Sequence, residues 1–244
     1  MQEGSRRAIL AALAANLGIA IAKFVGFLIT GAASLLAEAV HSAADTSNQA
    51  LLLLGGNRAR RSATDEHPFG YGRERYFWAF VVALVLFSMG GLFAIYEGVE
   101  KLRHPHDVES LVVAVVILLL AVALETFSLV TAVREANHIR GGQSWWHFIR
   151  RSKNPELPVV LLEDTGAEIG LLLALFGVVM AHATDEPRWD AAGSLGIGIL
   201  LVVIALVLAT EMKSLLIGEA ASPRDQDAIR GAIEGSPSVR RLIQ

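Results

Sequence analysis

Cysteine is absent from the 244-residue sequence. Disulfide bonds, thiolate metal sites and cysteine nucleophiles are therefore excluded. Any metal site in this protein has to be built from imidazole and carboxylate groups, so thiolate-preferring Cu⁺ is the poorest fit.

Charged residues are scarce as well. They make up 18% of the chain, whereas hydrophobic residues make up 53% and the mean hydropathy is +0.49. Soluble domains carry roughly 25% charged residues, so this composition is typical of a membrane protein. The sequence also has no basic stripe interleaved with aromatic residues, and nucleic-acid binding is not supported.

Long apolar runs fill most of the chain. Six of them reach the roughly 20 residues that a helix needs to cross a bilayer. We therefore predict an all-α membrane protein in which residues 1–218 form a six-transmembrane-helix bundle. The predicted spans are Ile9 to Thr30, Ser34 to Gly56, Tyr76 to Glu97, Ser110 to Val133, Pro158 to His182 and Ala191 to Thr210.

Basic residues gather on one side of these spans. The N-terminal segment and the second and fourth connections are rich in arginine, whereas the other three connections hold few basic residues. Because cytoplasmic segments carry the excess of lysine and arginine, both termini are predicted to be cytoplasmic. We expect a multi-pass protein of a bacterial inner (plasma) membrane.

The second span carries polar residues that lipid should exclude. Glu38, His41 and Asp45 follow one another at helical spacing and form one stripe. His41 and Asp45 lie four residues apart, so they can direct two ligand atoms to one ion from adjacent turns. A hydrogen-bonded structural histidine beside acids in a wet crevice is the alternative.

More acids occur in the fifth span, which contains Glu163, Asp164 and Glu168, and in the fourth, which contains Glu125. Ionisable residues within a membrane are costly unless they are paired. Within the predicted spans only Lys23 could neutralise them. A divalent cation or protons must therefore supply the missing positive charge.

Histidine together with carboxylates suits Zn²⁺, while oxygen-rich ligation also admits Mn²⁺, Fe²⁺ or Co²⁺. Such ligands must lose their protons before they bind metal, so metal and protons compete for one site. This competition is a physical basis for metal/proton exchange, with His41 titrating nearest to neutral pH.

The His41-x-x-x-Asp45 pair, the acids of the fifth span and the sequence HPFGYGRER (His67 to Arg75) before the third span resemble the cation diffusion facilitator family. The resemblance is greatest to its branch of zinc transporter 9-like proteins. It implies a homodimer that exports divalent cations from the cytoplasm in exchange for protons by alternating access, with Zn²⁺ as the expected substrate. It also assigns metal binding to His41, Asp45 and Asp164.

One position departs from the family pattern. Val160 stands four residues before Asp164, where the family usually has histidine. Glu168, Glu163 and Glu125 are the candidates for the fourth ligand. Glu168 is favoured because it shares a helix face with Asp164, whereas Glu163 lies roughly 100° around the helix.

Residues 219–244 follow the last span. Ser222 and Gly235 are expected to begin and close a short helix, and the sequence SVRRLIQ resembles the opening of a strand. A frayed tail is one interpretation. The other, which the family resemblance implies, is the start of a truncated cytoplasmic domain of ferredoxin-like type.

Two other functions compete with transport. The acids could serve a membrane-embedded metal-dependent hydrolase, although the sequence has no H-E-x-x-H motif and no nucleophile beside a base. A metal-sensing membrane protein without transport activity is the other alternative. We predict a transporter rather than an enzyme.

Overall fold

Long helices make up the protein in the computed structural model, which describes residues 3–153, 155–221, 223–236 and 238–239. These residues form no strand, and the predicted all-α class is confirmed. The helices are α1 (Glu3–Thr30), α2 (Ala33–Ala59), α3 (Glu74–Val85), a π-helical segment (Leu86–Leu92), α4 (Phe93–Arg103), α5 (Leu111–Arg140), α6 (Trp145–Arg151), α7 (Glu156–Thr184), α8 (Arg188–Ile217) and α9 (Pro223–Glu234).

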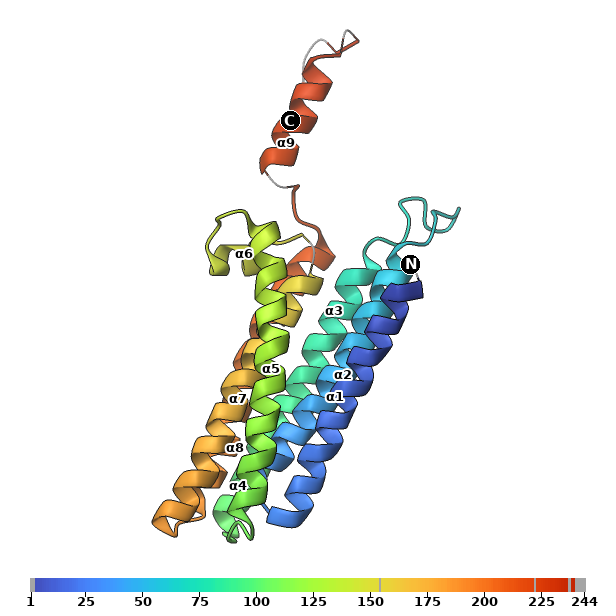
Figure 1. The fold of residues 1–244 in the computed structure, drawn as a ribbon. Helices are drawn as coiled ribbons and strands as arrows, with labels where there is room; N and C mark the ends of the chain where they lie inside the picture. The colour runs from blue at the N-terminus through green and yellow to red at the C-terminus, as the bar shows by residue number, and fades with distance from the viewer. Residues whose placement is uncertain (1–2, 154, 222, 237, 240–244) are drawn as a thin grey trace.

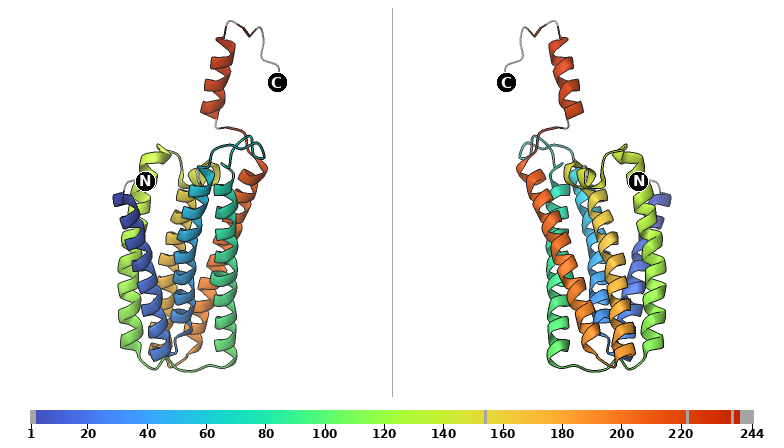
Figure 2. Two further views of the ribbon diagram at one scale, coloured as in Figure 1. Left: turned by 90° about the vertical axis from the view of Figure 1, so that its right-hand side faces the viewer. Right: turned by 90° about the vertical axis from the view of Figure 1, so that its left-hand side faces the viewer.

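The long helices lie side by side in an elongated bundle (Figures 1 and 2). The N-terminus, the C-terminal helix α9, the short helix α6 and the loop between α2 and α3 all lie at one end, which we call the terminal end. The turns from α1 to α2, from α4 to α5 and from α7 to α8 lie at the opposite, distal end. The arginine-rich segments of the sequence therefore share one end of the bundle.

Among the residues that the structure describes, four helices are long and apolar enough to cross a membrane: Glu74–Arg103, which combines α3, the π-helical segment and α4, together with α5, α7 and α8. Large apolar side chains such as Leu120, Phe127 and Ile199 are exposed on their outer surfaces, as contact with lipid requires. The other two expected spans fall within α1 and α2. The described side chains of α1 give a shorter apolar stretch, and polar side chains lower the hydropathy of α2.

The third span runs beyond its expected limit. We expected it to end at Glu97 and to leave Lys101 in a connection. The helix instead continues to Arg103, and Lys101 is only 1% exposed. The expectation that Lys23 is the one cation inside the bundle is therefore wrong.

Glycine lets the helices pack closely. A Cβ atom at Gly198 of α8 would lie 2.8 Å from the carbonyl oxygen of Gly91 in the π-helical segment, and one at Gly177 of α7 would lie 2.9 Å from the carbonyl oxygen of Trp189. Such small residues allow backbones to approach in membrane helix pairs. The α2 helix contacts α1, α3, α4, α7 and α8, so its polar stripe faces protein on most sides.

The α9 helix corresponds to the short helix expected after the last span. Its expected cap, Ser222, and residues 240–244 of the expected strand lie outside the described residues. The ferredoxin-like domain accordingly stays a prediction.

Candidate metal centre

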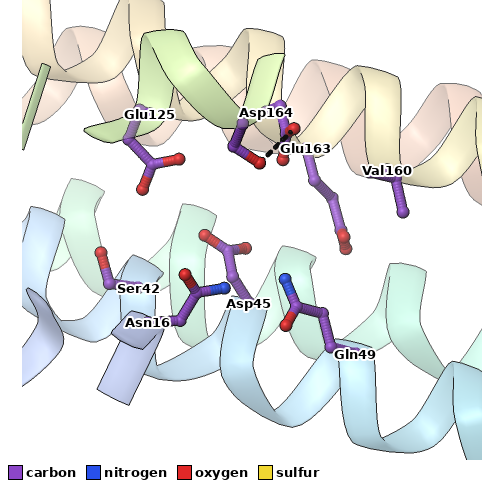
Figure 3. Close-up of a pocket in the computed structure, with 9 residues that line it drawn as sticks. Asn16, Ser42, Asp45, Gln49, Glu125, Val160, Glu163 and Asp164 are labelled. Atoms are coloured by element: carbon purple, nitrogen blue, oxygen red, sulfur yellow. Dashed lines mark hydrogen bonds between the residues drawn. The ribbon is translucent and has the colours of Figure 1, made fainter. Parts of the chain in front are cut away.

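A small polar cavity lies inside the bundle between α1, α2, α5 and α7 (Figure 3). Its volume is about 20 Å³, which is room for one water-sized occupant. Four of the lining side chains are carboxylic acids that come from three helices. The lining consists of Asn16, Ser42, Asp45, Gln49, Glu125, Ser128, Val160, Glu163 and Asp164.

Asp45 of α2 points across the cavity toward Asp164 of α7, and Glu125 of α5 lies to one side (Figure 3). The hydroxyl of Ser128 donates a hydrogen bond of 2.9 Å to Oδ2 of Asp164. This bond fixes the Asp164 carboxylate toward α5. Second-sphere bonds of this kind orient metal ligands in proteins.

Glu163 is held from the other side of the cavity. The amide nitrogen of Asn48 donates a hydrogen bond of 2.7 Å to Oε1 of Glu163, whose residue is 4% exposed. Lys23, which the sequence offered as a partner for this acid, bonds to Glu38 instead. Asn48 leaves one carboxylate oxygen of Glu163 available to an ion.

His41 lies just beyond the cavity lining. Its side chain is fully buried, and its Nδ1 atom lies 3.5 Å from Oδ1 of Asp45. Neither ring nitrogen makes a hydrogen bond to the part of the chain that the structure describes. A Cβ atom at Gly90 of the π-helical segment would come within 3.8 Å of Nδ1. The imidazole thus has both nitrogens unengaged beside the acidic cavity, and π-helical segments often accompany functional sites.

Glu168 takes a different position from the other acids of α7. The hydroxyl of Thr126 on α5 donates a hydrogen bond of 3.0 Å to its Oε1 atom, and Glu168 is not among the residues that line the cavity. The structure therefore brings Asp45, Glu163, Asp164 and Glu125 together, with His41 adjacent and Glu168 outside.

The acidic side chains line one cavity, but their carboxylate groups do not meet at a single point. Within the described ranges, no three histidine, aspartate or glutamate side chains stand close enough to hold a metal ion. Val160, which occupies the position where histidine was expected, does line the cavity. An apolar side chain thus stands where the family pattern would supply a nitrogen ligand.

Two buried lysines complete the polar interior. Lys23 bonds to Glu38 and Ser42 near the cavity. At the distal end, Lys101 donates a hydrogen bond of 2.8 Å to Asp190 at the start of α8. Asp190 also accepts hydrogen bonds of 2.7 and 3.2 Å from the backbone N–H groups of Ala33 and Ser34.

Asp190 therefore caps α2 and joins it to α4 and α8 in a fully buried network. Sequence reasoning missed this network. The signal was available in the sequence: Asp190 stands at the beginning of the last apolar run, and Lys101 stands just after the third apolar run.

Residues 9–217 match the cation efflux transmembrane domain. The chain belongs to this family, the cation diffusion facilitators, and it is an integral membrane protein. Its relatives group it with the SLC30A9-like branch, as the sequence motifs predicted.

The human proton-coupled zinc antiporter SLC30A9, mitochondrial, is 33% identical over 242 residues, which cover 98% of this chain and 43% of the human protein. Metal tolerance protein C4 of Arabidopsis thaliana is 31% identical over 227 residues, covering 92% of this chain and 50% of the plant protein. The zinc transporter ZitB of Escherichia coli is 24% identical over 238 residues, covering 97% and 65%.

The chain thus spans less than half the length of the SLC30A9 relatives. The human relative is named as mitochondrial, so the expectation of a bacterial inner membrane gains no support from it.

Proposed function

We propose that this protein is a secondary-active transporter that exchanges a divalent cation for protons, with Zn²⁺ as the expected cargo. One observation carries the proposal: four carboxylic acids from α2, α5 and α7 line one cavity of ion size in the interior of a membrane bundle. Acids in such a place need a cation or protons to neutralise them. The printed names of the human and bacterial relatives, a zinc antiporter and a zinc transporter, support zinc as the cargo.

Exchange follows from the chemistry of the ligands. A carboxylate or imidazole binds either a proton or a metal ion with the same lone pair. Entry of one divalent ion into the cavity displaces protons from these groups, and its release lets protons return. When the two events occur on opposite sides of the membrane, the cycle is an antiport by alternating access.

The proposed ligands are His41, Asp45 and Asp164, with one further acid. For that acid the cavity favours Glu163 or Glu125, because both line it and Glu168 does not. His41 lies beside Asp45, with 3.5 Å between Nδ1 and Oδ1, which supports binding of one ion by this pair together with the acids of the cavity. Mn²⁺, Fe²⁺ and Co²⁺ suit the same donors.

The proposal includes a topology. Residues 1–218 form the transmembrane domain with six spans, both termini lie in the cytoplasm, and residues 219–244 begin a ferredoxin-like domain. The start of α1 and the α9 helix lie at the same end of the bundle (Figure 1), and the arginine-rich connections at that end support a cytoplasmic position for it. Transport then runs outward from the cytoplasm, in a homodimer.

A hydrolase is the weaker alternative, because a cavity of about 20 Å³ admits an ion but not a lipid or peptide substrate. A transport experiment distinguishes a transporter from a metal sensor without transport activity. In proteoliposomes with an internal zinc dye and a pH dye, we expect zinc entry to drive protons the opposite way. Asp45→Asn should abolish both signals, and the exposed control Asp227→Asn should retain them.

Zinc binding by the purified protein without flux would replace the transporter by a sensor. Retention of coupled flux in Asp45→Asn would show that the cavity is not the transport site.

A further inference from the structure

A buried ion pair stands directly beside the acidic cavity. The ammonium of Lys23 in α1 donates hydrogen bonds of 2.9 Å to Oε2 of Glu38 and 2.8 Å to Oγ of Ser42, both on α2. Lys23 and Glu38 are each 0% exposed. Ser42 is one of the residues that line the cavity, so a single hydrogen bond separates the lysine charge from the cavity wall.

The pair has a defined direction. Glu38 lies seven residues before Asp45 on α2, which is about 10 Å along a helix, whereas Ser42 lies three residues before it, which is about 5 Å. The Glu38 carboxylate reaches Gly170 of α7, where a Cβ atom would lie only 2.5 Å from Oε1. Glu38 is not among the residues that line the cavity, whereas the ammonium of Lys23 bonds to Ser42, which is. The positive end of the pair is therefore the end in contact with the cavity lining.

Ser42 transmits this polarity. An ammonium group can only donate hydrogen bonds, so the Ser42 oxygen must accept from Lys23. The hydroxyl then keeps its own hydrogen for donation, and its oxygen is poorly disposed to bind a cation. In Figure 3 this oxygen points into the space between α2 and Glu125.

We propose that the Lys23–Glu38 pair is an internal counter-charge whose positive end, acting beside Ser42, limits the affinity of the acidic cavity for its divalent cation. This inference rests on the proposed transport function. A site surrounded only by acids would hold a divalent ion too tightly to release it, and conduction requires binding that is weak enough to let the ion leave. Lys23 supplies that limit without occupying the site.

The test replaces both charges together. In Lys23→Met/Glu38→Gln the ammonium is lost, the net charge is unchanged and no buried charge is left unpaired. We expect the affinity for Zn²⁺, measured by calorimetry on the full chain in detergent, to rise about tenfold, because the positive charge beside the cavity repels a divalent ion more strongly than its more distant counter-charge attracts it, and the variant removes both. Zinc flux should slow, with a lower KM and a lower maximal rate.

A matched variant identifies the cause. Lys101→Met/Asp190→Asn makes the same chemical change in the distal pair, and its zinc affinity should stay within about threefold of the unchanged protein, because the Coulomb energy falls with distance and the two opposite charges of a remote pair cancel. Thermal unfolding of every variant verifies that the fold persists.

Unchanged or lower zinc affinity in folded Lys23→Met/Glu38→Gln overturns this proposal. Failure of the unchanged protein to bind zinc at all would instead contradict the proposed function, so the two failures are distinguishable.

Discussion

Replacing Glu163 with glutamine removes one negative charge from the cavity and changes little else. The amide side chain would keep an oxygen in place of Oε1, so it can still accept the 2.7 Å hydrogen bond from Asn48. The fold and the position of the side chain should therefore persist. Any loss of zinc affinity then reports the missing charge and ligand atom.

The expected loss is large. A unit negative charge about 5 Å from a divalent ion contributes roughly 7 kcal/mol at an effective dielectric constant of about 20. Desolvation of the carboxylate offsets much of this gain. We therefore expect a loss of about 100-fold in zinc affinity, which corresponds to about 3 kcal/mol.

Glu168→Gln is the matched control. It makes the same substitution on the same helix, and the new side chain can keep the 3.0 Å hydrogen bond from Thr126. Because Glu168 does not line the cavity, it supplies no ligand atom and its charge lies farther from the ion, so the affinity loss should stay below about fivefold. The sequence by itself favoured the opposite ranking of these two acids.

Isothermal titration calorimetry with Zn²⁺ on purified protein compares the variants, and thermal unfolding shows whether both remain folded. A folded Glu168→Gln protein that loses as much affinity as Glu163→Gln, or more, would refute the assignment of the cavity as the binding site.

Three further outcomes are expected. Ser128→Ala removes the 2.9 Å hydrogen bond that orients the Asp164 carboxylate. Zinc binding should weaken about tenfold, as happens when a hydrogen-bond partner of a metal ligand is lost, and an unchanged affinity in calorimetry would contradict this. Lys101→Met leaves the buried Asp190 carboxylate without its cationic partner and should lower the free energy of unfolding by about 3 to 5 kcal/mol. The measurement is the unfolding temperature in detergent, which should fall, and an unchanged temperature would argue against the ion pair. Lowering the pH should weaken zinc binding because protons compete for the ligands; titrations at several pH values that give one affinity would exclude competition.

Much of the fold could be predicted because hydropathy and helix length respond directly to the bilayer. The charge-poor composition predicted membrane helices, and α5, α7 and α8 with the long helix Glu74–Arg103 agree with it. The third span was set too short, because Lys101 was taken for a loop residue. A charged residue near a helix end can stay helical and buried when another helix offers it a carboxylate, as Asp190 does.

Part of the candidate site could be predicted in the same way. Helical spacing predicted that His41 and Asp45 share a face, and the two side chains do lie 3.5 Å apart. Spacing cannot rank acids on different turns of α7, because that ranking depends on how the helix is rotated against α2 and α5. The structure turns Glu163 and Asp164 to the cavity and Glu168 to Thr126.

The sequence by itself determined that this chain enters a membrane, that its interior carries more acids than cations, and that any metal ligands are nitrogen and oxygen atoms. These properties follow from composition and from the fixed period of the α-helix. Only the tertiary structure decided which acids meet, that Lys23 bonds to Glu38 and Lys101 to Asp190, and that Val160 faces the cavity. Those facts depend on the rotation and depth of each helix against its neighbours. Both are set by side-chain packing between segments that lie far apart in the chain.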